Sequence, residues 1–94
     1  DAGLAEVGRL ERLKGLYLTR TGITDAGLGH LRNLSKLETL ILWDTAIGDA
    51  GLEHLKSLQQ LKEIILWNTR VTQQGAAALQ TSLPECDVST TMFE

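Results

Sequence analysis

The sequence has little cysteine, little proline, few aromatic residues and no excess of basic charge. Only one cysteine and one proline occur among its 94 residues. The single Cys86 excludes an internal disulfide, and no second thiol is present for a cysteine-based metal site. The net charge is -3, and the nine Lys and Arg residues are spread along the chain. We therefore expect no nucleic-acid partner, because nothing gathers the positive charge that a phosphate backbone requires.

Long hydrophobic runs are also absent from the sequence. A membrane-spanning helix needs about 20 consecutive apolar residues, and no stretch approaches that length, so we expect no membrane insertion. Hydrophobic residues make up 43% and charged residues 22%, which is typical of a folded globular domain. The sequence has no initiator methionine, and Asp1 falls inside a repeated motif, so we expect the chain to derive from a longer protein with earlier repeats.

The dominant positive feature is an internal 24-residue period that needs no gap, with Leu13, Leu37 and Leu61 beginning successive units. The three full units read LKGLYLTRTGITDAGLGHLRNLSK, LETLILWDTAIGDAGLEHLKSLQQ and LKEIILWNTRVTQQGAAALQTSLP. The sequence before them matches only the second half of a unit, and the sequence after them turns polar. We therefore expect one domain over 1–94, composed of a partial repeat, three full repeats and a carboxyl-terminal cap: 1–12, 13–36, 37–60, 61–84 and 85–94.

Each unit changes its apolar spacing halfway along. The first half alternates with period two, as in residues 40–42, which predicts a short strand with one buried face. The second half spaces its leucines by three, as at Leu28 and Leu31, which predicts a short helix or helical turn. Thr24 and Asp25 come just before this stripe, and we expect their side-chain oxygens to cap its amino end.

The two ends of the chain depart from this pattern. In the partial repeat, we expect Leu4, Val7 and Leu10 to cover one end of the core. In the last unit, alanine replaces the leucine of the DAGL motif, so we expect the last helix to pack closer or to be shorter, with Pro84 ending it.

A strand and a helix of these lengths cannot bury both apolar faces alone, so we expect the units to stack. Neighbouring strands lie about 4.8 Å apart, whereas packed helices prefer about 8–10 Å, so the strand side should be concave. The predicted fold class is α/β: a right-handed superhelical solenoid with parallel strands on the concave face and short helices on the convex face.

These residues resemble the leucine-rich-repeat family. The family pattern LxxLxLxx(N/C)x(L/I) is matched in the second unit by Leu37, Leu40, Leu42, Thr45 and Ile47. The resemblance covers nearly the whole chain. The TDAGLxHL segments and the closing LPECDV are similar to bacterial repeats of the planctomycete and verrucomicrobial type, in which such arrays often accompany other domains.

The chain departs from the family pattern at the asparagine or cysteine position. Threonine stands there in all three units, at Thr21, Thr45 and Thr69. A hydroxyl can donate to a turn carbonyl, but it has one donor where an asparagine amide has two. We therefore expect a weaker ladder of turn hydrogen bonds.

The predicted binding surface is the strand face that points away from the core. If Leu16 and Leu18 face the core, the residues between and beside them face outward, and the same columns recur in later units. Both tryptophans fall on this face. The candidate partner-binding residues are Tyr17, Thr39, Ile41, Trp43, Glu63, Ile65 and Trp67. Polar residues expected around them are Arg20, Asp44, Asn68 and Arg70 on one side, and Glu63 and Asp87 on the other.

Several uses of this surface are open. A contiguous apolar and aromatic patch is typical of a protein interface, which favours a non-catalytic protein-protein interaction module. The tryptophans could instead bind a carbohydrate or another small ligand in a lectin-like manner. The surface could also dock on other domains of the same parent chain. Finally, Trp43 and Trp67 could simply stack on each other across adjacent strands and shield the sheet.

No catalytic or metal-binding constellation is predicted. His30 and His54 occupy equivalent positions on neighbouring helices, but a metal site needs three or four ligands converging at about 2 Å, so we expect surface histidines. Cys86 lies at a strand start, away from both histidines, and thus lacks a base within hydrogen-bond reach. The glycines of DAGL recur once per unit and therefore serve the repeat. We expect no enzyme activity, no cofactor and no metal, and a protein as the partner.

Overall fold

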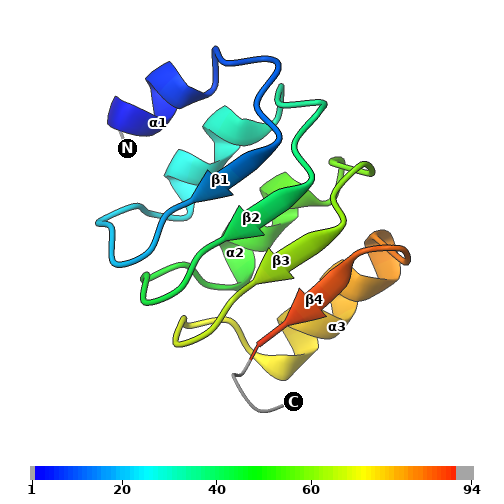
Figure 1. The fold of residues 1–94 in the computed structure, drawn as a ribbon. Helices are drawn as coiled ribbons and strands as arrows, with labels where there is room; N and C mark the ends of the chain where they lie inside the picture. The colour runs from blue at the N-terminus through cyan, green and yellow to red at the C-terminus, as the bar shows by residue number, and fades with distance from the viewer. Residues whose placement is uncertain (1, 91–94) are drawn as a thin grey trace.

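The computed structural model describes residues 2–90 and has an α/β fold built on one parallel sheet (Figure 1). The four strands lie side by side in chain order. Their bounds are β1 (Gly15–Tyr17), β2 (Thr39–Ile41), β3 (Glu63–Ile65) and β4 (Asp87–Ser89). The predicted α/β class is therefore confirmed at the level of a small parallel sheet with helices.

The strands pair at the spacing of the sequence period. Leu16 lies opposite Leu40, Leu40 opposite Ile64, and Ile64 opposite Val88. The register places Gly15, Thr39, Glu63 and Asp87 in one column and Tyr17, Ile41, Ile65 and Ser89 in another, as the 24-residue period predicts. The same period predicts a third column, made of Thr19, Trp43, Trp67 and Thr91, and its last member lies outside the described residues.

The helices are short and cover one face of the sheet (Figure 1). They are α1 (Ala2–Val7), η1 (Ala26–Leu31), α2 (Asp49–Leu52), η2 (Glu53–Leu55) and α3 (Gln73–Ser82). The leucine spacing of three suits η1 well, because a 3₁₀-helix has three residues per turn.

The last helix is the longest of these, so the expectation of a shorter one is wrong. With ten residues, α3 exceeds the six of α1 and of η1. The helix contains a run of alanines, and alanine has the highest helix propensity of any residue type. The Thr72 hydroxyl also accepts a hydrogen bond from the Gly75 N–H at 3.1 Å, which caps the helix. The helix ends at Ser82, just before Pro84, as predicted.

The core lies between the sheet and the helices. Leucines and isoleucines from both layers are fully buried there: Leu28, Leu31, Leu34, Leu37, Leu40, Leu42, Ile47, Leu55 and Ile64. At the amino-terminal end Leu4 is buried and Val7 packs against the cluster. Leu10 is 54% exposed, so the prediction that it covers the core is wrong. It follows α1 in a turn, beyond the helical segment that packs on the core.

Aspartates link the starts of neighbouring helices. Asp25 accepts a hydrogen bond from the Gly48 N–H at 2.8 Å. Asp49 repeats this contact with Thr72, whose N–H and hydroxyl donate to the two carboxylate oxygens at 2.9 and 2.6 Å. The expectation that Asp25 caps its own helix is thus wrong. Thr24 does so alone, because its hydroxyl accepts from the Gly27 N–H at 3.3 Å.

Glycine makes room for each of these carboxylates. A Cβ at Gly51 would lie 2.6 Å from Asp25 Oδ1, and a Cβ at Gly75 would collide with the Asp49 carboxylate. No side chain fits in that space without displacing the aspartate. The DAG sequence therefore encodes contacts between segments one sequence period apart: the aspartate of one segment sits against the glycine of the next.

We predict that Gly75→Ala destabilises the protein although alanine favours helices. The added methyl group overpacks the Asp49 carboxylate, an effect of about 1–3 kcal/mol. In an Asp49→Ala background the same substitution should stabilise by about 1 kcal/mol, the helix-propensity gain. Urea unfolding of the four proteins measures both effects. Gln74→Ala, one residue away on the exposed surface, is the control. Equal effects of Gly75→Ala in both backgrounds would show that the aspartate and glycine do not interact.

Candidate binding surface on the strand face

The strand face opposite the helices is left uncovered by the described part of the chain (Figure 1). Its side chains alternate with those of the core. Leu40 in β2 is fully buried. Tyr17 in the edge strand β1 lies opposite the residue that follows Leu40, and it is 71% exposed. The alternation predicted from the sequence holds in β2, where Leu40 is buried between half-buried neighbours, but not in β3, where Ile64 and Ile65 are both buried. The register brings Tyr17, Ile41 and Ile65 into one column of the sheet.

The two tryptophans meet edge to face. Their ring centroids lie 5.6 Å apart, and the ring planes form an angle of 81°. The Trp67 indole N–H also donates to Ser89 Oγ at 2.9 Å, which fixes that ring against β4. An aromatic pair of this kind contributes about 0.5–1.5 kcal/mol. The two rings thus pack against each other, and both remain partly exposed.

The predicted site residues differ in how much surface they present. Thr39, Ile41, Trp43 and Trp67 are half-buried, while Tyr17 and Glu63 are exposed. Ile65 lies in register with Ile41 but is only 9% exposed, so it offers little surface for contact. It has a strand on either side, in contrast to Tyr17 at the sheet edge.

A hydrogen-bonded polar row borders the aromatic residues where the strands end. Arg20 Nε donates to Asp44 Oδ2 at 3.1 Å, and the Asn68 amide donates to the other carboxylate oxygen. These bonds, with that from Asn68 the stronger influence, hold the pKa of Asp44 below its ordinary value. Three of the predicted rim residues, Arg20, Asp44 and Asn68, are thus connected by hydrogen bonds.

All three residues of this row have left-handed backbone conformation. Their φ angles are 58° at Arg20, 57° at Asp44 and 52° at Asn68. Asparagine and aspartate are the non-glycine residues that tolerate this region best, so Asp44 and Asn68 carry a sequence signal for these turns. Each turn is closed by the threonine that follows. Thr45 Oγ1, for example, donates to the Leu42 carbonyl at 3.0 Å.

Two carboxylates lie side by side on the other border of the face. Glu63 and Asp87 are opposite each other in the register of β3 and β4, and both are exposed. Burial, then the charges of Asp87 and Glu63, raise the pKa of the neighbouring Cys86 thiol to about 11. The thiol is therefore protonated and only 4% exposed, which does not suit a nucleophile.

The histidines lie on the helix side, away from this surface. Arg32 Nη2 is 2.7 Å from His54 Nδ1, so this histidine takes part in a hydrogen bond on the surface. Within residues 2–90 no group of three or more His, Cys, Asp or Glu side chains could hold a metal ion. No helix in the same residues is long and apolar enough to cross a bilayer.

No family model matches the chain, and no curated protein matches it.

We predict that Cys86 resists alkylation in the folded protein. A pKa of about 11, against the ordinary 9.0, leaves about 100-fold less thiolate near pH 8. Mass spectrometry after iodoacetamide treatment should show modification in urea but almost none in buffer. Replacing both neighbouring carboxylates, as Glu63→Gln with Asp87→Asn, should raise the native rate several-fold. Rapid native labelling would show that the thiol is exposed and ionised.

We predict that stability falls in acid as Asp44 and Asp49 become protonated. Hydrogen bonds lower the pKa of both groups, from Asn68 and Arg20 to Asp44 and from Thr72 to Asp49. A carboxyl whose folded pKa is depressed stabilises above its unfolded value, near 3.8, and this contribution is lost as the pH falls through the folded pKa.

Urea midpoints measured from pH 6 down to pH 2.5 should therefore be flat above about pH 5 and fall below about pH 4. Asp49→Asn should reduce the fall, whereas Glu85→Gln, at an exposed position, should leave it unchanged. An unchanged acid profile in Asp49→Asn would contradict the assignment.

Proposed function

We propose that this chain is a leucine-rich-repeat solenoid that acts as a non-catalytic protein-binding module through a concave strand face. The repeat interpretation is supported by agreement between the sequence and the strand register. The sequence has a 24-residue period, and the strands pair in chain order at the same offset, as Leu16 with Leu40 and Leu40 with Ile64. On this interpretation 1–94 is one domain, with a partial repeat, three full repeats and a closing segment.

The observation that carries the binding proposal is the uncovered strand face. Aromatic and apolar side chains gather there, led by Tyr17 at 71% exposure and by the partly exposed tryptophans. Aromatic residues dominate the energetics of protein interfaces. The polar row beginning at Arg20 and the carboxylates of Glu63 and Asp87 would form a rim. A partner that brings an apolar side chain near a basic one would suit this arrangement.

A carbohydrate ligand is the second candidate, but the ring geometry disfavours it. A sugar ring stacks on a flat aromatic face, and two rings at 81° to each other do not offer one flat platform. Trp67 is in addition held by its bond to Ser89. A third candidate is docking on another domain of the same polypeptide, which would use the same side chains.

We predict that substitutions on the strand face abolish partner capture. The chain, immobilised and exposed to lysate of its source organism, should retain a protein that Tyr17→Ser with Trp43→Ser does not retain. Loss of two aromatic contacts should weaken binding at least about 30-fold, the scale of an interface hot spot. Gln74→Ser with Thr81→Ser, on the exposed surface of α3, is the matched control and should bind normally.

The other candidates give different results in the same format. A carbohydrate ligand would appear as saturable quenching of tryptophan fluorescence by one glycan in an array. Docking within one polypeptide would leave no captured partner, and would make the isolated chain self-associate through this face in sedimentation. Equal capture by the folded strand-face variant and its control would contradict the proposal.

A further inference from the structure

Within residues 2–90, the carboxylates of Glu63 and Asp87 have no hydrogen-bond or ion-pair partner, and both side chains are exposed. Other carboxylates beside the sheet are engaged by the chain itself. Asp44 accepts hydrogen bonds in the polar row, and Glu38 lies 3.7 Å from Lys62 Nζ. Lys62, the basic residue next to Glu63, is therefore directed elsewhere. The two carboxylates are available to a group from another molecule.

The same two carboxylates lie on directly opposed residues of β3 and β4. Glu63 and Asp87 are partners in the strand register. Like charges directly opposite each other destabilise a sheet. Both charges also add to burial in raising the pKa of the Cys86 thiol, so both carboxylates lie close to that one point. The free chain therefore contains a repulsion that a positive group near both carboxylates would relieve.

A basic side chain fits this position better than a metal ion. Calcium and magnesium take about six or more oxygen ligands. Within the described residues, no third His, Cys, Asp or Glu side chain joins these two carboxylates in a metal-binding group. An arginine guanidinium needs only hydrogen-bond acceptors, and its rigid fork of donors can meet two carboxylates at once. The net charge of -3 favours the approach of a basic partner as well.

The aromatic residues of the strand face are within reach of the same partner. Trp67 follows Glu63 by four residues, a span of at most about 13 Å in extended backbone. The Trp67 N–H is used by Ser89, whereas the Trp43 N–H has no acceptor within residues 2–90. Trp43 therefore has a donor free for a main-chain carbonyl. Alternate side chains of an extended segment point to one side, so such a segment can bring a basic and an apolar side chain to this face.

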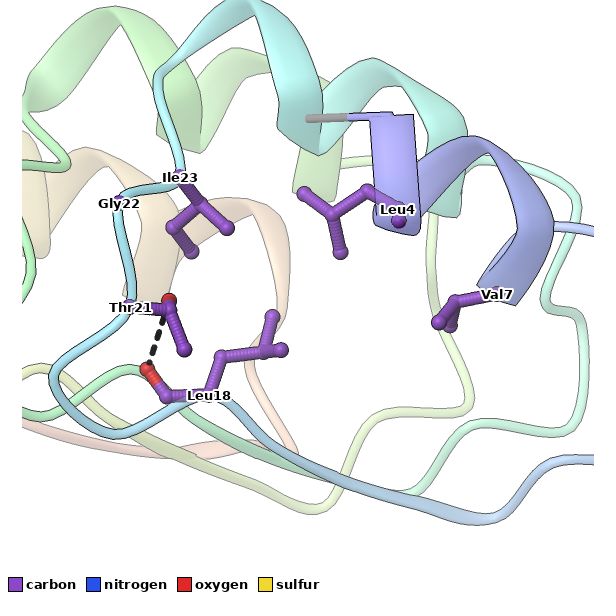
Figure 2. A pocket seen from close by; sticks show the side chains of 7 residues that line it. Leu4, Val7, Leu18, Thr21, Gly22 and Ile23 are labelled. Carbon is purple, nitrogen blue, oxygen red and sulfur yellow. Dashed lines mark hydrogen bonds between the residues drawn. The ribbon is translucent and has the colours of Figure 1, made fainter.

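The apolar pocket at the amino-terminal end carries no such charge. Its volume is about 370 Å³, and Figure 2 shows Leu4, Val7, Leu18 and Ile23 around it. None of its lining residues is charged, and Leu4 and Ile23 are buried, with 3% and 6% of their surface exposed. The pocket therefore does not specify a partner by charge. The strand face, in contrast, combines exposed aromatic rings with unpaired carboxylates.

We propose that the strand face binds an extended protein segment with a basic side chain that reaches Glu63 and Asp87, and with an apolar side chain about four residues away that packs on Trp43 and Trp67. The basic side chain, arginine in preference to lysine, removes the repulsion between the two carboxylates. An acidic or neutral segment would leave them unpaired. The inference rests on the proposed function, since it names the partner of the same surface.

Selection of random phage-displayed peptides on the immobilised full chain tests this proposal. Arginine and lysine should be several-fold more frequent in the selected peptides than in the library. On the variant Glu63→Gln with Asp87→Asn this excess should disappear, and on Glu63→Lys with Asp87→Lys acidic peptides should replace the basic ones. Glu6→Gln with Glu53→Gln removes the same amount of charge from α1 and η2, and this matched control should select basic peptides normally.

Fluorescence anisotropy of one selected peptide measures the contribution of the carboxylates. Glu63→Gln with Asp87→Asn should weaken binding at least about 10-fold in low salt, and the loss should shrink in high salt. The same variant without peptide should melt at a higher temperature, because the repulsion is gone. A lower melting temperature would mean that the two carboxylates stabilise the free chain, which contradicts their proposed role.

The outcomes separate this inference from the proposed function. Peptides without a basic excess, whose capture still fails on Tyr17→Ser with Trp43→Ser, would overturn the inference and leave the proposed function standing. Basic peptides that this strand-face variant binds normally would overturn both, because they bind elsewhere. If the folded chain selects no peptide at all, the proposed extended partner is wrong.

Discussion

The structure depends on contact between segments that lie one sequence period apart. Each strand has three residues and most helices have one or two turns, so no segment can bury its apolar side alone. Backbone bonds join neighbouring segments: the Leu18 N–H donates to the Ile41 carbonyl at 2.8 Å, and the Leu42 N–H to the Ile65 carbonyl at 2.8 Å. The aspartate contacts at the helix starts add a second connection. Stability is therefore shared along the sheet.

This constraint also determines which surfaces remain free for function. Packing between layers uses one face of each strand, and pairing uses both edges of the inner strands. Within the described part of the chain, the sheet is left with its outer strand face and with the outer edges of β1 and β4. The outer strand face carries Tyr17 and the two tryptophans, and it is the surface to which we assign a partner.

The sequence predicted the fold well where the period determines the answer. Register, the order of strands and the sides of Leu40 and Tyr17 all follow from the repeating frame and the alternation within it. It failed where a side chain acts outside its own segment. Asp25 satisfies the local rule for an N-cap, yet it binds the next segment, because the nearby glycine leaves it room. That choice depends on packing.

The sequence predicts which residues belong to the candidate site, but it does not predict their burial or the geometry of their side chains. Alternation places all seven residues on one face, but it does not show that Ile65 is almost fully buried or that the tryptophans meet edge to face. Those features depend on side-chain rotamers across three strands. Likewise, the hydrogen-bonded row through Asp44 needs three turns to align in left-handed conformation.

Native-state amide hydrogen exchange measures whether each segment is held in place by its neighbours. The N–H groups of Leu18 and Leu42 make equivalent bonds of 2.8 Å to the next strand, but among the described strands only that of Leu42 has a further strand on its preceding side. We expect the Leu42 amide to exchange only by global unfolding, while the Leu18 amide exchanges much faster through local opening of the end segment. Equal protection of the two amides would show that neighbouring segments do not hold each other in place.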